Sequence, residues 1–365
     1  MIGDGCVRAS DVCERERMNG NGMQATGSAG RRSGGCRPDP DRAWRAMLRG
    51  RMRSVAALHR RLARRGMAVP AVVEPRVPFG VCVTPYYADL IRKADVSDPV
   101  YRMCVPAPEE LRPETGLAPD PFGEMGAQGP LPGVIRRYRD RAVVLATRDC
   151  AVHCRHCTRR AMLATGGSPG GVANARRVAS WLAGEPEVRE VILSGGDPLT
   201  LSDARLERLL RTIRAVPRVE QIRIGTRVPV VLPQRITPGL VRRLLRFHPL
   251  WLNTHFNHPA ELTPEAARAC ARLVDAGIPV GNQAVLLRGV NDDAETLESL
   301  FRGLLRIRVR PYYLLQCDPV EGAGHFRVPI RRGRALMKVL RARMTGLGIP
   351  VYAADIPGAA SKQPL

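Results

Sequence analysis

The stretch Thr147-Arg-Asp-Cys-Ala-Val-His-Cys-Arg-His-Cys-Thr-Arg-Arg160 contains three closely spaced cysteines. Cys150, Cys154 and Cys157 have the spacing C-x3-C-x2-C. Three thiolates in one short loop suit three corners of a cubane iron–sulfur cluster, and the fourth iron is then left without a protein ligand. Because an iron with an open position can bind and reductively cleave a small molecule, the loop predicts a reactive cluster and not only an electron carrier.

Zinc and disulfide bonds are the alternatives for these thiols. A zinc site usually needs four protein ligands, often as two short pairs, and the nearby histidines, His153 and His156, lie inside the tight triplet. The chain shows no secretory signal, so its ten cysteines indicate a reducing compartment and metal chemistry. The sequence therefore favours the cluster and predicts a cytoplasmic protein.

The net charge of +23 raises the question of nucleic-acid binding. The basic residues are spread along the whole chain, and aromatic residues, which could stack on bases, make up only 4% of it. Of the 57 basic residues only Lys93, Lys338 and Lys362 are lysines, so the charge reflects an arginine-rich composition. We expect no nucleic-acid partner and no membrane association, since no stretch is long and apolar enough to cross a bilayer.

The chain is predicted to have three parts. Residues 1–36 predict a disordered leader, and residues 37–140 an N-terminal helical region. From residue 141 to residue 365, short apolar runs alternate with helix-like stretches, which predicts parallel βαβ units. The result is an α/β fold, either a partial (β/α)6 barrel with an N-terminal helical extension or a doubly wound sheet, with the active site at the carboxyl ends of the strands. The predicted strands are 142–147, 191–194, 221–225, 250–254, 280–287 and 309–316, with a seventh at 350–353.

The cysteine triplet, placed just after a strand, resembles the signature of the radical S-adenosylmethionine (SAM) enzymes.

Glycines and polar residues stand at several of the other strand ends. The two glycines after the second strand would let backbone approach a ligand such as SAM closely, although a plain βα turn is the alternative. Buried amide and imidazole groups at later strand ends must find partners, either in a structural network or around SAM. The predicted SAM-contacting residues are Ser194, Gly195, Gly196, Asp197, His255 and Gln283.

Two acids and a lysine lie near the last strands. Asp318 and Asp355 each follow a strand, so they could jointly hold a cation over one barrel mouth, although an isolated Asp after a strand is often a cap. Lys362 ends a loop of small residues that could present an amine into a pocket. Schiff-base chemistry requires such an amine, and a frayed tail lysine is the alternative.

From Pro85-Tyr-Tyr87 to Lys362, the sequence resembles the lysine 2,3-aminomutase family. The blocks that carry the resemblance include Cys-Arg-His-Cys-Thr-Arg-Arg, Leu-Ser-Gly-Gly-Asp, Trp-Leu-Asn-Thr-His-Phe-Asn-His-Pro and Val-Leu-Leu-Arg-Gly-Val-Asn-Asp. These enzymes combine SAM, a [4Fe–4S] cluster and pyridoxal 5′-phosphate (PLP). The resemblance implies a radical migration of the amino group of lysine from the α to the β carbon, which gives L-β-lysine.

The resemblance also implies roles for individual residues. Cys150, Cys154 and Cys157 match the cluster ligands, and Lys362 matches the lysine that binds PLP. Tyr138 and Arg141 fall in the stretch that contacts PLP. Arg159 matches the arginine that pairs with the substrate carboxylate, and Asp318 and Asp355 match the acids that hold the side-chain ammonium of lysine. The sequence positions of these matches are Tyr138, Arg141, Cys150, Cys154, Cys157, Arg159, Asp318, Asp355 and Lys362.

The chain departs from the long form of this family in one respect. Long-form members continue into a C-terminal segment with zinc-binding cysteines, which pair with a further cysteine at the position of Asp293 in this sequence. No zinc is therefore expected.

The resemblance leaves several substrates and partners open. A 2,3-aminomutase acting on arginine, or on lysine destined for elongation factor P, is the alternative within the class, and a zinc- or cluster-containing nucleic-acid-binding protein is the alternative outside it. The expected partners are an amino acid substrate, a reductant such as flavodoxin or ferredoxin, and further copies of the chain.

Overall fold

A single sheet runs through the part of the chain that the computed structural model describes, which is residues 40–71, 77–124, 131–164 and 174–365. The order of the strands in the sheet is their order in the sequence. Strands β2 to β8 pair in parallel, whereas the short β1 and β9 pair antiparallel at the two ends. The strands are β1 (Val134–Tyr138), β2 (Arg141–Thr147), β3 (Glu190–Gly195), β4 (Gln221–Gly225), β5 (Leu250–Thr254), β6 (Val280–Leu286), β7 (Arg310–Gln316), β8 (Val351–Ala354) and β9 (Gln363–Pro364).

The two ends of this sheet approach each other. Tyr138, the last residue of β1, donates a hydrogen bond from its hydroxyl to Asp355 Oδ1, just after β8, at 2.7 Å. Strands so far apart in the sheet order can meet only if the sheet curls. A doubly wound sheet also reverses its strand order, and this sheet does not. The prediction of a partial barrel is therefore confirmed.

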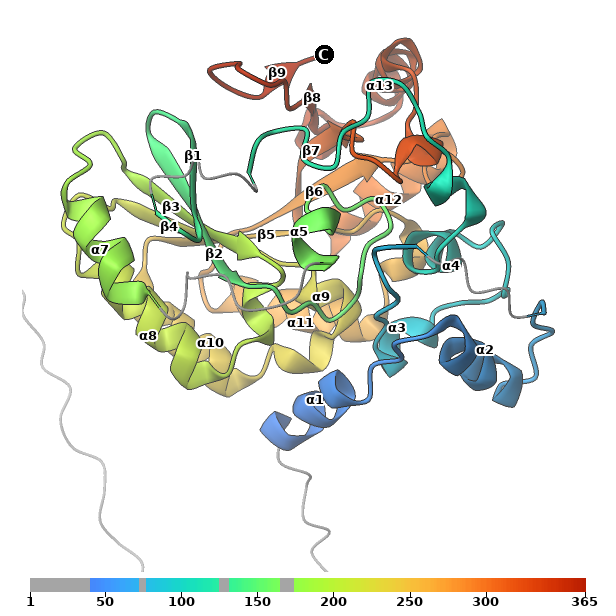
Figure 1. Cartoon of the computed structure of the whole chain (residues 1–365), viewed down its shortest axis with the longest axis horizontal. Helices are drawn as coiled ribbons and strands as arrows, with labels where there is room; N and C mark the ends of the chain where they lie inside the picture. The colour runs from blue at the N-terminus through green and yellow to red at the C-terminus, as the bar shows by residue number, and fades with distance from the viewer. Residues whose placement is uncertain (1–39, 72–76, 125–130, 165–173) are drawn as a thin grey trace, which may run out of the picture. The chain divides into compact units, whose positions relative to one another are not determined.

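Helices connect the parallel strands and cover the outside of the curled sheet. Neighbouring helices pack in chain order, α7 against α8, α8 against α10, α10 against α11 and α12 against α13, and Figure 1 shows α7, α8 and α10 side by side along one edge of the molecule. The α-helices are α1 (Pro40–Arg49), α2 (Val55–Arg64), α3 (Pro85–Ala88), α4 (Pro99–Cys104), α5 (Arg160–Ala164), α7 (Ala175–Ala183), α8 (Asp203–Arg214), α9 (Val228–Val231), α10 (Pro238–Leu244), α11 (Pro264–Asp275), α12 (Ala294–Arg306) and α13 (Ile330–Arg343). The 3-10 helices are η1 (Pro108–Leu111), η2 (Pro198–Thr200), η3 (Pro233–Arg235), η4 (Leu245–Phe247), η5 (Pro259–Glu261), η6 (Gly324–Phe326) and η7 (Gly346–Gly348).

Capping residues fix where the crossover helices begin. The side chains of Ser202, Thr237, Thr263 and Asp293 accept hydrogen bonds from backbone N–H groups in the first turns of α8, α10, α11 and α12. These bonds satisfy donors that a helix start leaves without partners. Asp293, the residue that the sequence comparison singled out in the question of zinc, is thus the N-terminal cap of α12.

The structure differs from the sequence-based prediction at the ends of the sheet and in the N-terminal region. Strand β1 lies within 37–140, which was expected to be helices and loops, and neither β9 nor α13 was predicted. The helix-like pattern over 37–65 is two helices, because Ser54 caps a new start at α2. The disordered leader predicted for residues 1–36 lies outside the described residues, and the proposed domain limits stay a prediction.

The main core lies between the sheet and its helices and extends to the N-terminal helices, where Trp44, Leu58 and Leu62 are buried with it. A smaller apolar cluster packs beneath the cysteine loop and consists of Phe79, Ile135, Leu145, Met162 and Leu163. Cys150 and Cys157 pack against this smaller cluster. The loop that carries the cysteines therefore rests on apolar side chains from both β1 and β2.

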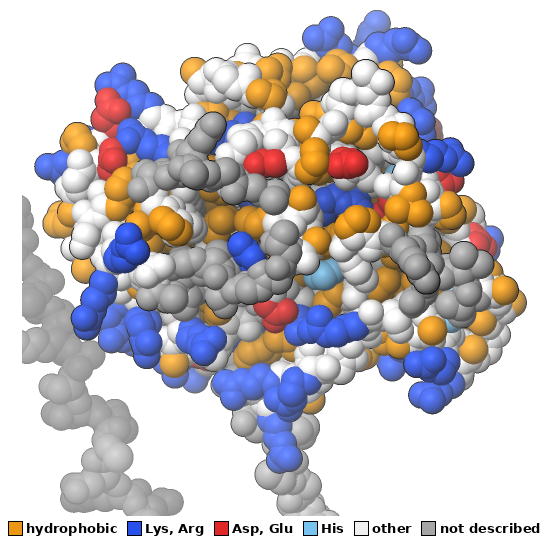
Figure 2. Space-filling view, viewed as in Figure 1, with side chains coloured by type: hydrophobic (Ala, Val, Ile, Leu, Met, Phe, Trp, Pro, Cys, Tyr) orange, Lys and Arg blue, Asp and Glu red, His pale blue; other side chains and the backbone are white. Residues whose placement is uncertain are grey.

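The surface charges are dispersed, as the spread of basic residues along the sequence predicts. Figure 2 shows Lys and Arg side chains spread around the rim of one face, with hydrophobic and uncharged atoms between them. In the described ranges, no helix has the length and apolar character needed to span a bilayer.

Candidate active site

A cavity of about 430 Å³ opens at the carboxyl ends of the parallel strands. Its walls include residues from the ends of β2 to β8 and from the loops that follow them, as the barrel topology requires. Every site residue predicted from the sequence, from Tyr138 to Lys362, lines this cavity. The structure therefore brings the predicted groups into one place, and their contacts distinguish what each can do.

The three cysteines of the C-x3-C-x2-C loop are free thiols in the cavity wall. Burial raises the pKa of the Cys150 thiol well above its ordinary value, and burial together with Cys154 raises that of Cys157 to about 11. These two thiols hold their protons until a metal binds, so metal loading must release protons.

The donor set fits an iron–sulfur cluster. Thiolates are the ligands of such clusters. The described residues contain no group of three or more His, Cys, Asp or Glu side chains gathered to hold a metal ion. A cubane does not require that its three thiolates converge on one ion, because each binds a different iron.

Buried arginines fasten the cysteine loop to the N-terminal region. Arg155 Nε donates to Glu110 Oε1 at 2.8 Å, and Arg160 forms a second ion pair with the same carboxylate. Burial alone would raise the pKa of Glu110, but the two arginines outweigh it and hold the pKa below its usual value. A buried carboxylate paired in this way is costly to unpair, so residues 108–111 help to set the position of the loop.

The glycines after β3 serve the packing of two loops. Gly196 N donates to Thr147 O at 2.6 Å, and Asp197 N donates to Asp149 O at 2.8 Å. A Cβ on Gly195 would lie 2.6 Å from Thr147 O, and one on Gly196 would collide with Asp149 O. The expected reason for these glycines was close approach to a ligand, whereas the structure shows close approach to the cysteine loop.

A Gly196→Ala variant is expected to lose about 1–3 kcal/mol of stability, because the added methyl group forces two backbones apart. The measurement is the free energy of unfolding from denaturant titration of the purified apoprotein. Gly346→Ala is the matched control, since a Cβ there meets no atom within 4 Å. Equal stability of the two variants would contradict this account of the loop packing.

A lysine and an acid pair at the far end of the cavity. Lys362 Nζ forms an ion pair with Asp355 Oδ2, and Arg137 lies 3.4 Å from Asp355 Oδ1, the atom that accepts from Tyr138. Burial alone would raise the pKa of Asp355, but Lys362, Tyr138 and Arg137 outweigh it and hold the pKa below its ordinary value. Asp355 is therefore an ionised carboxylate in a cation-binding position.

Asp318 lies in the same cavity, but its pKa is shifted in the opposite direction from that of Asp355. It accepts a hydrogen bond from the Thr158 hydroxyl. Burial, and then the charge of Asp355, raises the pKa of Asp318 to about 6. An additional cation near Asp318 would relieve both effects, so the pair can accept more positive charge than Lys362 provides.

Arg159 has a partner that the sequence did not reveal. Its Nε donates to Glu124 Oε2 at 2.6 Å and its second terminal nitrogen to Glu124 Oε1 at 3.1 Å, while the other terminal nitrogen donates to Ser194 Oγ at 3.2 Å. The two-point contact fixes the plane of the guanidinium in the cavity wall. Glu124 stands in a proline-rich stretch without periodicity, so no pattern identified it.

Comparisons with known proteins identify the family. The Radical SAM superfamily model matches residues 144–300, which include the cysteine loop. L-lysine 2,3-aminomutase of Clostridium subterminale is 42% identical over 322 residues, covering 88% of this chain and 77% of that protein. This chain belongs to the lysine 2,3-aminomutase family of radical SAM enzymes. It is accordingly a radical SAM aminomutase homologue, which is an isomerase with an amino acid substrate, and its superfamily implies a [4Fe–4S] cluster and SAM.

Not all relatives in the lysine 2,3-aminomutase family are named for lysine. Glutamate 2,3-aminomutase of Clostridioides difficile is 39% identical over 294 residues, covering 80% of this chain and 69% of that protein. Family membership therefore leaves the substrate undecided. Among solved structures, a radical SAM methyltransferase from Sphaerobacter thermophilus aligns with a TM-score of 0.44 at 24% identity, over 63% of this chain and 72% of that chain, which is too weak a likeness to bear on function.

The residues that this family member was predicted to use for SAM have internal partners. The Asp197 carboxylate accepts from Thr226 Oγ1 at 2.6 Å and from Arg227 N at 2.8 Å, and burial raises its pKa. His255 Nδ1 lies 2.9 Å from Gln283 O, and burial lowers the pKa of this histidine to about 4, so the ring is neutral. These contacts hold the ends of neighbouring strands together, and the contacts with SAM stay a prediction.

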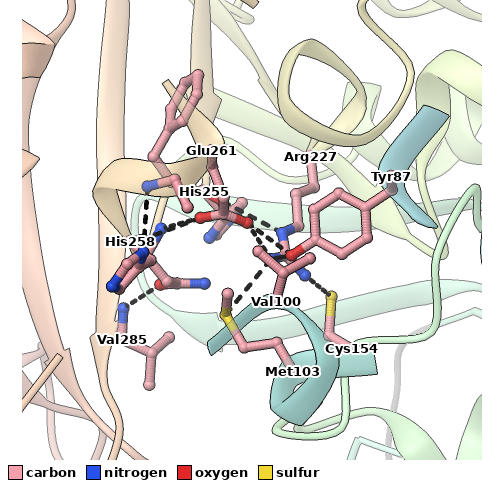
Figure 3. A network of polar contacts seen from close by, with 12 residues as sticks. Tyr87, Val100, Met103, Cys154, Arg227, His255, His258, Glu261 and Val285 are labelled. Atoms are coloured by element: carbon pink, nitrogen blue, oxygen red, sulfur yellow. Dashed lines mark hydrogen bonds and ion pairs between the residues drawn. The ribbon is translucent and has the colours of Figure 1, made fainter. Parts of the chain in front are cut away.

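Sequence reasoning also missed the arginine that meets the cysteine loop of this aminomutase homologue. Arg227, just after β4, donates from one terminal nitrogen to Cys154 Sγ at 2.8 Å, and from the other to Glu261 Oε1 at 2.6 Å and the Tyr87 hydroxyl at 2.9 Å. Figure 3 shows Arg227 between Glu261 and Cys154, with Tyr87 beside it. The block Gly-Thr-Arg-Val-Pro-Val-Val has no spacing that marks a ligand, so only the fold identifies this contact.

Proposed function

We propose that the protein is a PLP-dependent radical SAM aminomutase that interconverts L-lysine and L-β-lysine. The observation that carries the proposal is the pair of carboxylates, Asp318 and Asp355, in the same cavity as Lys362. A substrate with a distal ammonium must replace its lost water with buried negative charge. A distal carboxylate would instead meet two acids, which disfavours glutamate as the substrate.

The proposed cofactors have matching side chains in this cavity. Cys150, Cys154 and Cys157 would hold the cluster, and Lys362 would bind PLP. Tyr138 and Arg141 would contact PLP, and the Arg141 guanidinium lies 5.0 Å from the centre of the Tyr138 ring. The proposed SAM contacts are Ser194, Gly195, Gly196, Asp197, His255 and Gln283. When bound, the cluster and SAM supply the radical that removes a hydrogen atom from the substrate, and PLP supplies stabilisation of the migrating amino group.

The protein's own part in the reaction is binding and orientation. Arg159, held in one plane by Glu124, would pair with the substrate carboxylate, while Asp318 and Asp355 would hold the other end of the substrate. Two charged anchors at opposite ends of an amino acid fix which of its carbon atoms faces the radical source.

Another cationic amino acid is the second candidate substrate. A guanidinium can also be held by two carboxylates, so arginine fits the same acid pair, and lysine destined for elongation factor P would bind in the same way. The reductant is proposed to be a flavodoxin or a ferredoxin, and homo-oligomers are proposed as the assembly. No zinc is proposed.

The test is an anaerobic assay of the reconstituted full chain with SAM, PLP and dithionite. L-lysine, L-arginine, L-ornithine and L-glutamate are supplied separately, and β-amino acid products are separated by chromatography. We expect about four irons per chain and turnover of lysine at least tenfold faster than of the other three. Turnover of glutamate without lysine would contradict the use of the acid pair, and a chain that binds zinc but no iron would contradict the enzyme as a whole.

A further inference from the structure

Arg227 is a buried cation in contact with a predicted cluster ligand. Its side chain is only 7% exposed, and its terminal nitrogen lies 2.8 Å from Cys154 Sγ. A guanidinium keeps its charge in any protein environment. The hydrogen bond and the charge are therefore directed at the sulfur that would bind one iron of the cluster.

The counter-charge of Arg227 lies on the side away from the cysteine. Glu261 Oε1 accepts from the arginine at 2.6 Å, while Glu261 Oε2 accepts from the backbone N–H groups of Asn257 at 2.6 Å and His258 at 3.0 Å. These bonds fix the carboxylate in place. The ion pair is thereby oriented with its positive end toward Cys154 and its negative end held on the peptide backbone after β5.

The placement of Arg227 is determined by more than this pair. Its backbone N–H donates to Asp197 Oδ2 at 2.8 Å, its Nε donates to His255 O at 3.2 Å, and its second terminal nitrogen donates to the Tyr87 hydroxyl at 2.9 Å. Contacts from the loops after β3 and β5 and from helix α3 thus leave one terminal nitrogen for the sulfur. An ion pair that only stabilised the fold would need no contact with Cys154.

We propose that Arg227 is a positioning residue that raises the reduction potential of the cluster bound by Cys150, Cys154 and Cys157. Reduction adds one electron, and so one negative charge, to the cluster; the electron comes from a low-potential one-electron donor, and no proton is transferred. Hydrogen bonds to the ligand sulfurs and the net charge around a cluster set its potential. The reduced state is stabilised more than the oxidised state by a fixed cation, so Arg227 makes the first step of radical formation easier.

The experiment is an EPR-monitored redox titration of the reconstituted full chain, without SAM and without substrate. The variants are Glu261→Gln, Arg227→Lys and the double variant Arg227→Gln with Glu261→Gln, and Tyr87→Phe is the control that removes a hydroxyl but no charge. Iron content and melting temperature are measured on each sample. The proposal rests on cluster binding by the cysteine loop, and iron content in the wild type tests that separately from the potential.

The variants are expected to shift the potential in opposite directions. The double variant should lower the equilibrium constant for reduction about tenfold, which is 59 mV for one electron. Glu261→Gln, which leaves the cation without its counter-charge, should raise the potential, and Arg227→Lys should fall between the double variant and the wild type because the shorter amine cannot span both partners. Tyr87→Phe should change it little.

Two results would overturn the proposal. Equal potentials in all variants that retain iron would show that Arg227 serves only the fold. An unchanged potential together with weaker SAM binding, measured by isothermal titration calorimetry, would show that Arg227 acts on SAM and not on the cluster. If the double variant fails to bind iron, the potentials of Glu261→Gln and Arg227→Lys still test the proposal, because each has its own expected shift.

Discussion

A Lys362→Ala variant is expected to lose the visible absorbance of lysine-bound PLP and to reduce β-lysine formation to background. Lys362 is a primary amine in the cavity, and primary amines are the side chains that condense with the aldehyde of PLP. Absorbance spectra before and after dialysis, with product chromatography under anaerobic conditions, provide the measurement. The cysteine loop is not touched by this change, so iron content should stay at about four per chain.

The ion pair between Lys362 and Asp355 offers a second explanation for any loss, and a matched variant separates the two. Lys362→Arg keeps a cation that can pair with Asp355 but has no primary amine. If the lysine serves PLP, the arginine variant should lose absorbance and activity as completely as the alanine variant. Recovery of activity with arginine would instead assign Lys362 to charge balance alone.

An Asp318→Asn variant is expected to lower kcat/KM for lysine by a factor of about 10² to nearly 10⁴ while the cleavage of SAM continues. Removing one partner of a buried charge pair costs about 3–5 kcal/mol, and each 1.4 kcal/mol is a factor of ten. Product formation and 5′-deoxyadenosine are measured in the same reaction. Asp275→Asn, at an exposed position, is the control.

The pH dependence gives an independent check on Asp318. Its pKa of about 6 means that the carboxyl group is neutral below that pH and no longer attracts an ammonium. We therefore expect kcat/KM for lysine to fall as the pH decreases through 6, and the Asp318→Asn variant to lack this decrease. Asp355, whose pKa is held below its ordinary value, stays ionised over the same range. A decrease that persists in the variant would assign the pH effect to another group.

The sequence predicted the parts of this protein that repeat or cluster. The strand β4 (Gln221–Gly225) and the strand β5 (Leu250–Thr254) have the predicted limits, because each is a short run with buried apolar or β-branched residues between helix-like stretches. The cysteine triplet was visible because its three thiols are close in the chain. The predicted site residues line one cavity because barrel topology sends the carboxyl ends of all parallel strands to one mouth.

The parts that the sequence did not predict depend on contacts between distant segments. Strand β1 has little apolar pattern of its own and is defined by its pairing with β2. Glu124 and Arg227 were missed because an isolated acid or arginine gives no signal until the fold brings Arg159 or Cys154 to it. The sequence indicated that the glycines after β3 allow a close approach of backbone. The backbone that approaches them, however, belongs to the cysteine loop, and the sequence did not reveal this contact.

The hydrogen bond between Tyr138 and Asp355 has a consequence for stability in the presence of ligand. This bond joins the first strand of the curled sheet to the loop after β8. Its acceptor, Asp355, is also the carboxylate in the cation-binding position. A ligand that binds Asp355 therefore also affects the contact between β1 and the loop after β8. By linkage, ligand binding and this contact stabilise each other. The amide protons of β8 (Val351–Ala354) and of Gln363 in β9 (Gln363–Pro364) should report occupancy of the cavity through slower exchange with solvent.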